Sequence, residues 1–164
     1  MGYVRYIDKT REYYLSEGYD KPYRWARHDD IPFTPMKKPL AECRVGLVST
    51  SDVAIRTELA EKEPDSAKYV SSVYSVPSDT RAEVLVSRHD AYDHHATHLD
   101  DADSYFPITR LHEFAEQGRV ASVAPHYHCV GTAYSQRKTT EIDSPEILDR
   151  CRAEDVDVVL LTPV

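Results

Sequence analysis

Apolar and polar positions in the first 52 residues predict a helix, a wrapping segment and a buried strand. Residues 4–17 carry apolar side chains near helical spacing, and Gly18 is a suitable end for that helix. Four prolines then fall between residues 22 and 39, a density that excludes a helix or a central strand, so this segment is expected to wrap over a surface. Residues 44–50 have the apolar run of a buried strand, which ends in the polar turn 49–52.

The rest of the chain alternates predicted strands with predicted helices. Strands are expected at residues 83–87, 120–124 and 156–162. The last of them is nearly continuous in Val and Leu, as in a strand that is covered on both faces. Residues 108–118 have the spacing of a short amphipathic helix closed by a glycine. A further helix is expected to start with Asp143 or Ser144 as its N-cap and to end near Arg152.

This alternation indicates an α/β domain with a doubly wound, mainly parallel sheet and flanking helices, of the flavodoxin-like kind. The 164 residues fit one domain, with residues 1–43 as the N-terminal helix and proline-rich wrapping segment and residues 44–164 as the sheet core. Ligands of such sheets bind beyond the carboxyl ends of the strands. The predicted strands end in polar clusters, which are residues 49–52, 88–101 and 126–128 and the end of the chain. A binding site is therefore expected at those ends.

The last predicted strand is not followed by a helix. A buried parallel strand needs helices on both faces, and residues 156–162 are followed only by Pro163 and Val164. The sheet core is therefore expected to be C-terminally incomplete, or to be covered there by a partner.

Composition and charge exclude several classes of partner. The formal net charge is −8 and basic residues form only isolated pairs, so a nucleic acid is not an expected partner. The longest apolar runs are too short to span a membrane. The three cysteines are widely spaced, without a C-x-x-C pair, which fits a reducing compartment. We therefore expect a cytoplasmic protein with no nucleic-acid or membrane partner.

The densest group of chemically active side chains is the tract 88–101, which holds four histidines and four aspartates. One interpretation is acid–base chemistry, in which His89 is oriented by Asp93 or Asp100 and exchanges a proton with substrate. Another is a divalent metal site, although the spacing matches no established ligand motif. The imidazole ligands of that site would be His94, His98, His126 and His128. The third is a solvated polar loop whose carboxylates cap nearby helix ends.

His126 and His128 are two residues apart, so on an extended strand both imidazoles would point to the same side. That arrangement would present two imidazoles to a cleft. Cys129 would then face the other way, where a buried cysteine that behaves as a small apolar residue is the usual finding.

Several short segments follow one another in a distinctive order. They are residues 22–26, 32–33, 38–40, 89–101, 106–108, 110–111, 118–125 and 156–164. The first reads Pro-Tyr-Arg-Trp-Ala, residues 118–124 fit Gly-x-(Ile/Val)-x-Ser-Val-Ala, and the last is rich in Val and Leu. In this order, over essentially the whole chain, they resemble the selenoprotein B family of glycine, sarcosine, betaine and D-proline reductases.

The resemblance implies a redox enzyme that reductively cleaves a small-molecule substrate at a carbon–heteroatom bond with electrons from a thiol reductant such as thioredoxin. Relatives in the family carry selenocysteine or cysteine directly after the last strand, and another cysteine a few residues on. The corresponding position here is the one after Val164. That residue would be the nucleophile, and no other cofactor is expected in the chain.

The resemblance also implies roles for the polar residues. His89 and Asp93, with Asp100 in support, would position or protonate the substrate, and His126 and His128 would line the opposite wall. A UGA codon for selenocysteine is read as a stop when it is not recognised, so the ending after the last strand is expected to be a truncation at that codon. The chain as it stands would then be inactive in this reaction.

Two other functions stay open. One is a complete metal-dependent or acid–base enzyme, whose histidines would be His89, His94, His98, His126 and His128. The other is a non-catalytic subunit whose last strand docks onto another chain. A partly covered sheet also favours a homo-oligomer or a partner subunit, because contiguous exposed apolar surface tends to be covered.

Overall fold

The computed structural model describes residues 5–21, 26, 28–58, 72–88, 95, 98–131 and 135–163. The chain separates into two compact units, Met1–Thr34 and Pro35–Val164. The elements that could position a site all lie in the second unit.

The described part of the first unit contains one helix, α1, Tyr6–Ser16. It ends as predicted at a glycine, since Gly18 has a φ of +86°, a left-handed conformation that glycine adopts without strain. No residue of α1 is buried. Residues 28–34, within the proline-rich segment, form neither helix nor strand, which confirms that part of the prediction. Residues 22–25, including Trp25, lie outside the described residues.

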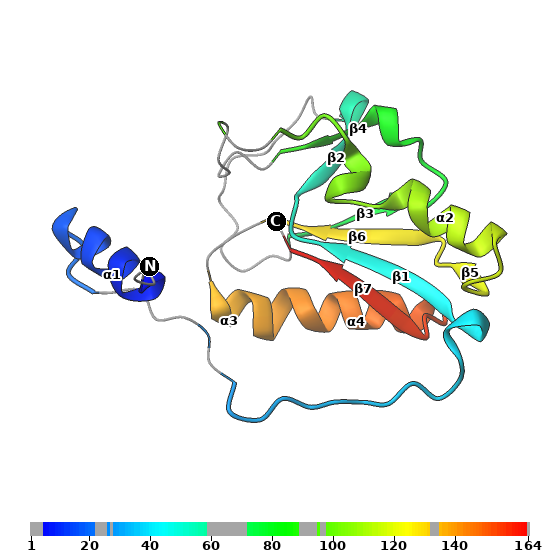
Figure 1. The fold of residues 1–164 in the computed structure, drawn as a ribbon, viewed down its shortest axis with the longest axis horizontal. Helices are drawn as coiled ribbons and strands as arrows, with labels where there is room; N and C mark the ends of the chain where they lie inside the picture. The colour runs from blue at the N-terminus through cyan, green and yellow to red at the C-terminus, as the bar shows by residue number, and fades with distance from the viewer. Residues whose placement is uncertain are drawn as a thin grey trace, which may run out of the picture. The chain divides into compact units, whose positions relative to one another are not determined.

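The main sheet of the second unit is built around β1, Arg44–Ser49. Its parallel neighbours are β5 (Ser122–Val123), β6 (His126–Val130) and β7 (Val158–Thr162). β7 pairs along the whole of one side of β1, from Val45 to Ser49. β5 and β6 follow each other along the other side, opposite the start and the end of β1 respectively (Figure 1). An antiparallel strand, β3 (Val73–Pro77), continues the sheet beyond β6.

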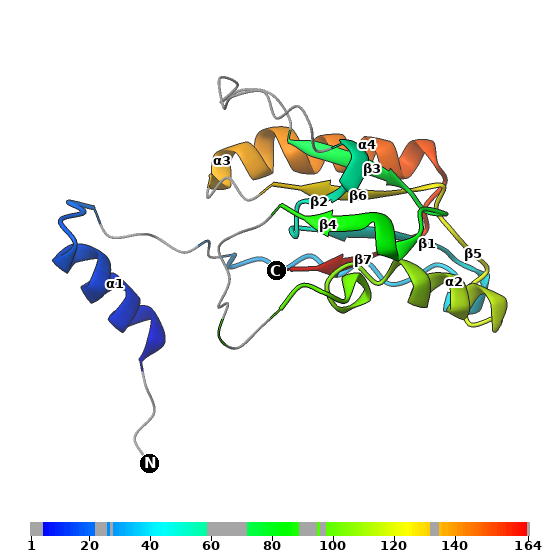
Figure 2. The same cartoon turned by 90° about the horizontal axis from the view of Figure 1, so that it is seen from above.

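Helices cover both faces of this sheet. α2, Ile108–Glu116, lies over one face, and the helix formed by α3 (Gln136–Lys138), a π-helical stretch (Thr139–Asp143) and α4 (Ser144–Ala153) lies over the other (Figures 1 and 2). Parallel strands with helices on both faces confirm the α/β class. The more specific flavodoxin-like arrangement stays a prediction.

The predicted strand at 83–87 is not part of the parallel sheet. A single turn of 3₁₀ helix, Ala82–Val84, leads into β4, Leu85–Ser87, which pairs antiparallel with β2, Val53–Ile55, in a separate small sheet. That small sheet lies on the α2 side of the main sheet (Figures 1 and 2). The polar turn after β1 makes β2 possible, because Asp52 has a φ of +48° and redirects the chain.

The second long helix begins earlier than the predicted cap at Asp143 or Ser144. Ser135 is its N-cap, since the hydroxyl accepts a hydrogen bond from the Lys138 N–H at 3.3 Å. Asp143 has helical φ and ψ and is buried, and its carboxylate accepts instead from the backbone N–H of Ser72 at 3.0 Å. Pro145 is tolerated within the continuous helix because it follows a π-helical turn, where the usual ladder is already interrupted.

A further prediction about the strands was wrong. Residues 126–128 were expected at the carboxyl end of a strand that began at Val120, but β5 has only two residues and His126 is the first residue of β6. The composition of the last strand is that of a strand covered on both faces, but the sheet core was expected to be incomplete beside it or covered by a partner. In the described part of the chain β7 is an edge strand, and Leu160 and Leu161 are 41% and 68% exposed.

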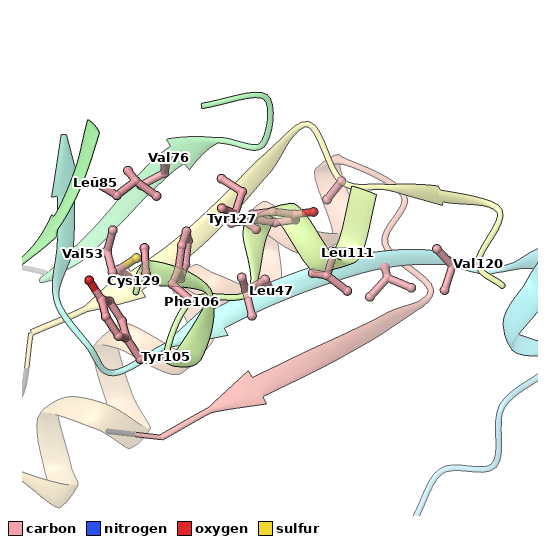
Figure 3. Packing of buried hydrophobic residues seen from close by; sticks show 14 residues of the cluster. Leu47, Val53, Val76, Leu85, Tyr105, Phe106, Leu111, Val120, Tyr127 and Cys129 are labelled. Atoms are coloured by element: carbon pink, nitrogen blue, oxygen red, sulfur yellow. The ribbon is translucent and has the colours of Figure 1, made fainter. Parts of the chain in front are cut away.

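The apolar core lies between the main sheet, α2 and the small sheet. Alternate residues of β1 and β6, among them Leu47 and Tyr127, point into it, and Figure 3 shows them beside residues of the segment that leads into α2. Phe106 and Tyr127 pack edge to face, with ring centroids 6.0 Å apart. Burying each such side chain contributes roughly 1.5–3 kcal/mol. This packing fixes β1 and β6, and therefore the positions of their carboxyl ends. Within the described residues, no helix is long and apolar enough to cross a membrane.

Candidate functional site

The carboxyl ends of β1, β6 and β7 meet at one edge of the main sheet, here called the carboxyl edge. The last residue of β1, Ser49, is fully buried there. Its hydroxyl lies 3.0 Å from the carbonyl oxygen of Thr162 at the end of β7 and 3.2 Å from that of Tyr105. The same oxygen accepts a hydrogen bond from the Ser51 N–H at 3.2 Å and lies 2.7 Å from the Ser51 hydroxyl. Ser49 therefore joins β7, β1 and the turn after β1.

The hydrogen bonds continue from that turn to β4. The Ser87 hydroxyl donates to the carbonyl oxygen of Ser51 at 2.6 Å. The backbone N–H of Arg88 donates to the carbonyl oxygen of Asp52 at 3.1 Å, and its guanidinium donates to the Asp52 carboxylate. We call Thr162, Ser49, Ser51, Ser87, Asp52 and Arg88 together the polar row. It runs from the end of β7 to the residue that precedes the His/Asp tract.

The ion pair of Asp52 and Arg88 is the charged part of the polar row. Their side chains are 14% and 26% exposed, so the pair is screened less than a surface pair and still faces solvent on one side. The guanidinium carbon of Arg88 lies 5.6 Å from the centre of the Tyr74 ring, within range of a cation–π interaction. Its Nε is buried and has no hydrogen-bond partner among the described residues. The arginine is therefore held from two sides while its donors are only partly used.

Two neighbours complete the edge. A Cβ at Gly131, the residue after β6, would lie 3.7 Å from the Asp52 carboxylate, so residue 131 itself places no side-chain atom against the ion pair. The Thr162 hydroxyl is buried and, in the part of the chain that the structure describes, has no hydrogen-bond partner. Hydroxyls, one guanidinium and one carboxylate can bind and orient a small polar molecule, but they are not redox groups.

The cysteines of the chain do not supply a reactive thiol at this edge. Cys129 lies in the apolar cluster (Figure 3). Burial, with a smaller contribution from Asp52, raises the pKa of its thiol to about 12, so the nucleophilic thiolate does not form near neutral pH. Cys43 and Cys151 are buried as well, and burial raises the pKa of Cys151.

The structure describes only one of the predicted acid–base residues in the tract. His89, Asp93 and His94 lie outside the described residues, so their predicted roles are untested. Asp100 is exposed, and its carboxylate lies 3.3 Å from Nδ1 of His98, which is also exposed. Within the ranges described, no group of three or more His, Cys, Asp or Glu side chains could hold a metal ion.

His126 and His128 both point toward α4, on the same side of β6, as their spacing predicted. Nδ1 of His126 lies 2.6 Å from a carboxylate oxygen of Glu154 at the end of α4. His128 is buried, and its Nδ1 lies 3.0 Å from the Ser75 hydroxyl, which also accepts a hydrogen bond from Arg150 at 2.5 Å. Burial lowers the pKa of His128, so the imidazole is neutral near pH 7. Neither residue joins the polar row, because β6 starts at His126 and ends at Val130.

The polar row contains residues that the sequence analysis did not select. The turn 49–52 was predicted at a strand end, but Ser49 and Asp52 were not separated from their neighbours. Arg88 is the first residue of the His/Asp tract, and the chemistry predicted for that tract rested on its imidazoles and carboxylates. The available signal was its position, since a cation directly after a predicted strand and directly before an acidic tract is a candidate for a fixed ion pair.

Comparison with known proteins places the chain in one family. The family model for glycine/sarcosine/betaine reductase selenoprotein B matches residues 5–164. The D-proline reductase subunit gamma of Acetoanaerobium sticklandii is 30% identical over 131 residues, which are 79% of this chain and 52% of that protein. The chain thus spans about half the length of the curated relative that it matches. No solved structure matches it. The family match covers nearly every residue and confirms the resemblance, and the chain belongs to the glycine/sarcosine/betaine reductase selenoprotein B family.

Proposed function

We propose that the chain forms part of a reductase component that cleaves a small substrate at a carbon–heteroatom bond with electrons from thiols. The observation that carries the proposal is the polar row at the carboxyl edge. It joins the end of β7, after which the family resemblance places the redox residue, to Arg88, after which the His/Asp tract begins. A nucleophile and an acid–base pair would therefore enter one site from the two ends of this row.

The proposed substrate is a small amino-acid derivative. The family description names glycine, sarcosine and betaine, and the relative is a subunit of D-proline reductase. All four compounds carry a carboxylate on the carbon that bears the nitrogen. The bond to be cleaved is then the bond between that carbon and the nitrogen, and the carboxylate is the group that every substrate shares.

The reaction balances with a dithiol as the electron donor. The carbon–nitrogen bond breaks, the nitrogen leaves with the bonding pair as an amine, and the carbon gains a hydrogen. Two thiols, or one thiol and one selenol, lose two electrons in total and form one S–S or Se–S bond. Their protons go to the carbon and to the leaving nitrogen.

The residues take the following roles in the proposal. The selenocysteine or cysteine that the resemblance implies after Val164 is the nucleophile, and a helix starting beyond β7 would stabilise its anion. His89 and Asp93 move protons near the leaving nitrogen, with Asp100 in support. The resemblance is the ground for the redox residue, and the 164-residue chain by itself is expected not to turn over.

The first test reads the native gene beyond the codon for Val164 and assays the protein that it encodes. We expect a UGA or cysteine codon there, and dithiol-dependent cleavage of the carbon–nitrogen bond by the encoded protein with its partner subunits. Glycine, sarcosine or betaine would release ammonia or an amine, and D-proline would open to 5-aminopentanoate. Replacing the new redox residue by serine should abolish turnover, whereas Cys43→Ser, remote from the carboxyl edge, should retain it. A gene that encodes neither residue there, or turnover that survives the serine substitution, would contradict the proposal.

We also propose that the protein works within an assembly, because the curated relative is one subunit of its enzyme. Purification from a native source under mild conditions should recover the chain with at least one other subunit. Sedimentation of the isolated chain gives its own oligomeric state, with which the size of the native complex is compared. A protein that is active as an isolated monomer would contradict this part of the proposal.

A further inference from the structure

We propose that Arg88 binds the carboxylate group of the substrate. The inference rests on the proposed function, since it takes the substrate to be one of the amino-acid derivatives named above. It adds a binding residue that neither the family description nor the name of the relative identifies.

Arg88 has donors to spare for such a ligand. A guanidinium carries five N–H donors and keeps its positive charge at any pH that the protein meets. Among the described residues, its guanidinium bonds one oxygen of the Asp52 carboxylate through one terminal nitrogen, so donors of the terminal nitrogens remain for a ligand. Its Nε also has no partner there, but that atom is buried and out of reach from solvent. A planar group with unused N–H donors matches the two oxygens of a carboxylate, which it binds through parallel hydrogen bonds.

The position of Arg88 is fixed before a ligand arrives. Its backbone N–H is bonded to Asp52, its guanidinium is bonded to the carboxylate of the same residue, and the Tyr74 ring lies against it. A side chain that is held in this way loses less rotational freedom when it binds a ligand, so more of the interaction energy appears as affinity. Asp52 thus positions the Arg88 side chain and uses only some of its N–H donors.

The solvent-facing part of the Arg88 side chain is the part that a ligand could contact. The Arg88 side chain is 26% exposed, so a ligand can reach part of it from solvent. Gly131 contributes no side chain beside the ion pair. The other described groups of the polar row are neutral hydroxyls, and Asp52 is its one carboxylate. Asp52 and Arg88 together carry no net charge, so a small anion would be held by hydrogen bonds to the guanidinium N–H groups that Asp52 does not use.

The polar row also connects Arg88 to the end of β7, where the proposed chemistry lies. Arg88 stands at one end of the row and the last residues of β7 at the other, and hydrogen bonds through Ser87, Ser51 and Ser49 connect them. A substrate held by its carboxylate at Arg88 would extend its carbon–nitrogen bond along this edge. Because the named substrates differ at nitrogen and share the carboxylate, one fixed anchor would serve all of them.

The test uses Arg88→Gln, Arg88→Lys and the matched control Arg119→Gln. The control also removes a guanidinium that packs on an aromatic ring, 4.0 Å above Phe114, but it lies near β5 at the other end of the sheet. Binding of D-proline and of prolinamide, in which an amide replaces the carboxylate, is measured by titration calorimetry on the 164-residue chain. Turnover of the same pair is measured in the full-length protein with its partner subunits. Thermal unfolding and circular dichroism report whether each variant is folded.

We expect Arg88→Gln to weaken carboxylate binding and raise KM about 10- to 100-fold, to remove the preference for D-proline over prolinamide, and to change kcat less. Arg88→Lys keeps the positive charge but loses the paired N–H donors of the guanidinium, so its affinity and KM should lie between those of wild type and Arg88→Gln. This variant keeps the test valid if the glutamine variant does not fold. Arg119→Gln should match wild type.

The outcomes separate the two proposals. Turnover that is independent of Arg88, with the carboxylate preference intact, overturns the inference and leaves the proposed function standing. Carboxylate binding that depends on Arg88, in a full-length protein without turnover, supports the inference and overturns the proposed function. A wild-type chain and holoenzyme that bind neither ligand overturn both.

Discussion

The hydroxyl of Ser49 lies 3.0 Å from the carbonyl oxygen of Thr162, so a buried side chain ties the end of β1 to the end of β7 beyond the strand pairing itself. The same hydroxyl accepts the backbone N–H of Ser51. One small side chain thus bonds to polar groups of β7 and of the turn after β1. The geometry of the polar row depends on it.

Replacing Ser49 by alanine should lower the free energy of unfolding by about 1–3 kcal/mol, because buried polar groups lose their partner without access to water. Ser104→Ala is the control. It also removes a hydroxyl that donates to a backbone carbonyl, at 2.7 Å from Asp101 O, but at an exposed site where water can replace it. Urea denaturation followed by circular dichroism measures both. Equal effects of the two substitutions would show that Ser49 has no special place in the fold.

The spacing of apolar residues correctly predicted the elements that depend mainly on local sequence. α1 and α2 were found where apolar spacing and a following glycine placed them, because local hydrogen bonds and a positive φ at Gly18 and Gly118 are properties of short segments. β1 was predicted correctly because a short, nearly continuous run of apolar residues is typical of a buried parallel strand. These signals lie within a few residues of one another.

The errors came from interactions between distant segments. β4 pairs with β2 because Asp52 turns the chain out of the main sheet, and a left-handed aspartate leaves little trace in the pattern of apolar residues. Asp143 looked like an N-cap, but its carboxylate binds Ser72, 71 residues earlier in the chain. The candidate site also depends on contacts between residues that are distant in the sequence. The strand-end rule located the carboxyl edge, whereas the pairing of Asp52 with Arg88 is visible only in three dimensions.

Gly131 is expected to control access to the Asp52–Arg88 ion pair. A Cβ at this position would lie 3.7 Å from the Asp52 carboxylate, an ordinary contact distance, so Gly131→Ala should bind D-proline like wild type. Gly131→Leu adds three carbons beyond that contact and should weaken carboxylate binding at Arg88 at least several-fold. Titration calorimetry compares the two variants, and their unfolding midpoints identify any loss of stability. Full affinity in the leucine variant would place the ligand elsewhere.

The cysteines of the described chain should be inert in the folded state. All three are buried, and burial raises the pKa of Cys129 to about 12. A thiol with such a pKa is almost entirely protonated at pH 8, and a buried one is also shielded from reagents. Native protein at pH 8 should therefore react with a disulfide reagent far more slowly than protein in 6 M guanidinium chloride, in which all three thiols are accessible. Rapid reaction of Cys129, located by peptide mapping, would restore it as a redox candidate.

His128 should make the fold less stable in mildly acidic solution. Burial, and to a smaller extent the nearby Arg150 and His126, lower the pKa of its imidazole below the usual 6.5 of histidine, while Glu154 and Glu146 oppose this. The unfolded chain therefore binds a proton at a higher pH than the folded chain does. Between the depressed folded pKa and 6.5, the unfolded state holds more protons, so the free energy of unfolding falls as the pH falls.

The contribution of this one residue is bounded. A single proton gives a slope of at most about 1.4 kcal/mol per pH unit, and the slope vanishes above the unfolded pKa. His128→Gln keeps a polar group beside Ser75 but removes the titrating imidazole, so the slope of the free energy of unfolding that His128 causes should disappear. Stability at pH 8 should also drop, because glutamine packs less well than histidine between β6 and α4. His98→Gln, at an exposed position, should leave the curve unchanged. Urea titrations from pH 5 to pH 8 give the slopes. If wild type and His128→Gln lose stability in parallel as the solution is acidified, His128 is not buried in its neutral form, and the contact between β6 and α4 must differ from the one described.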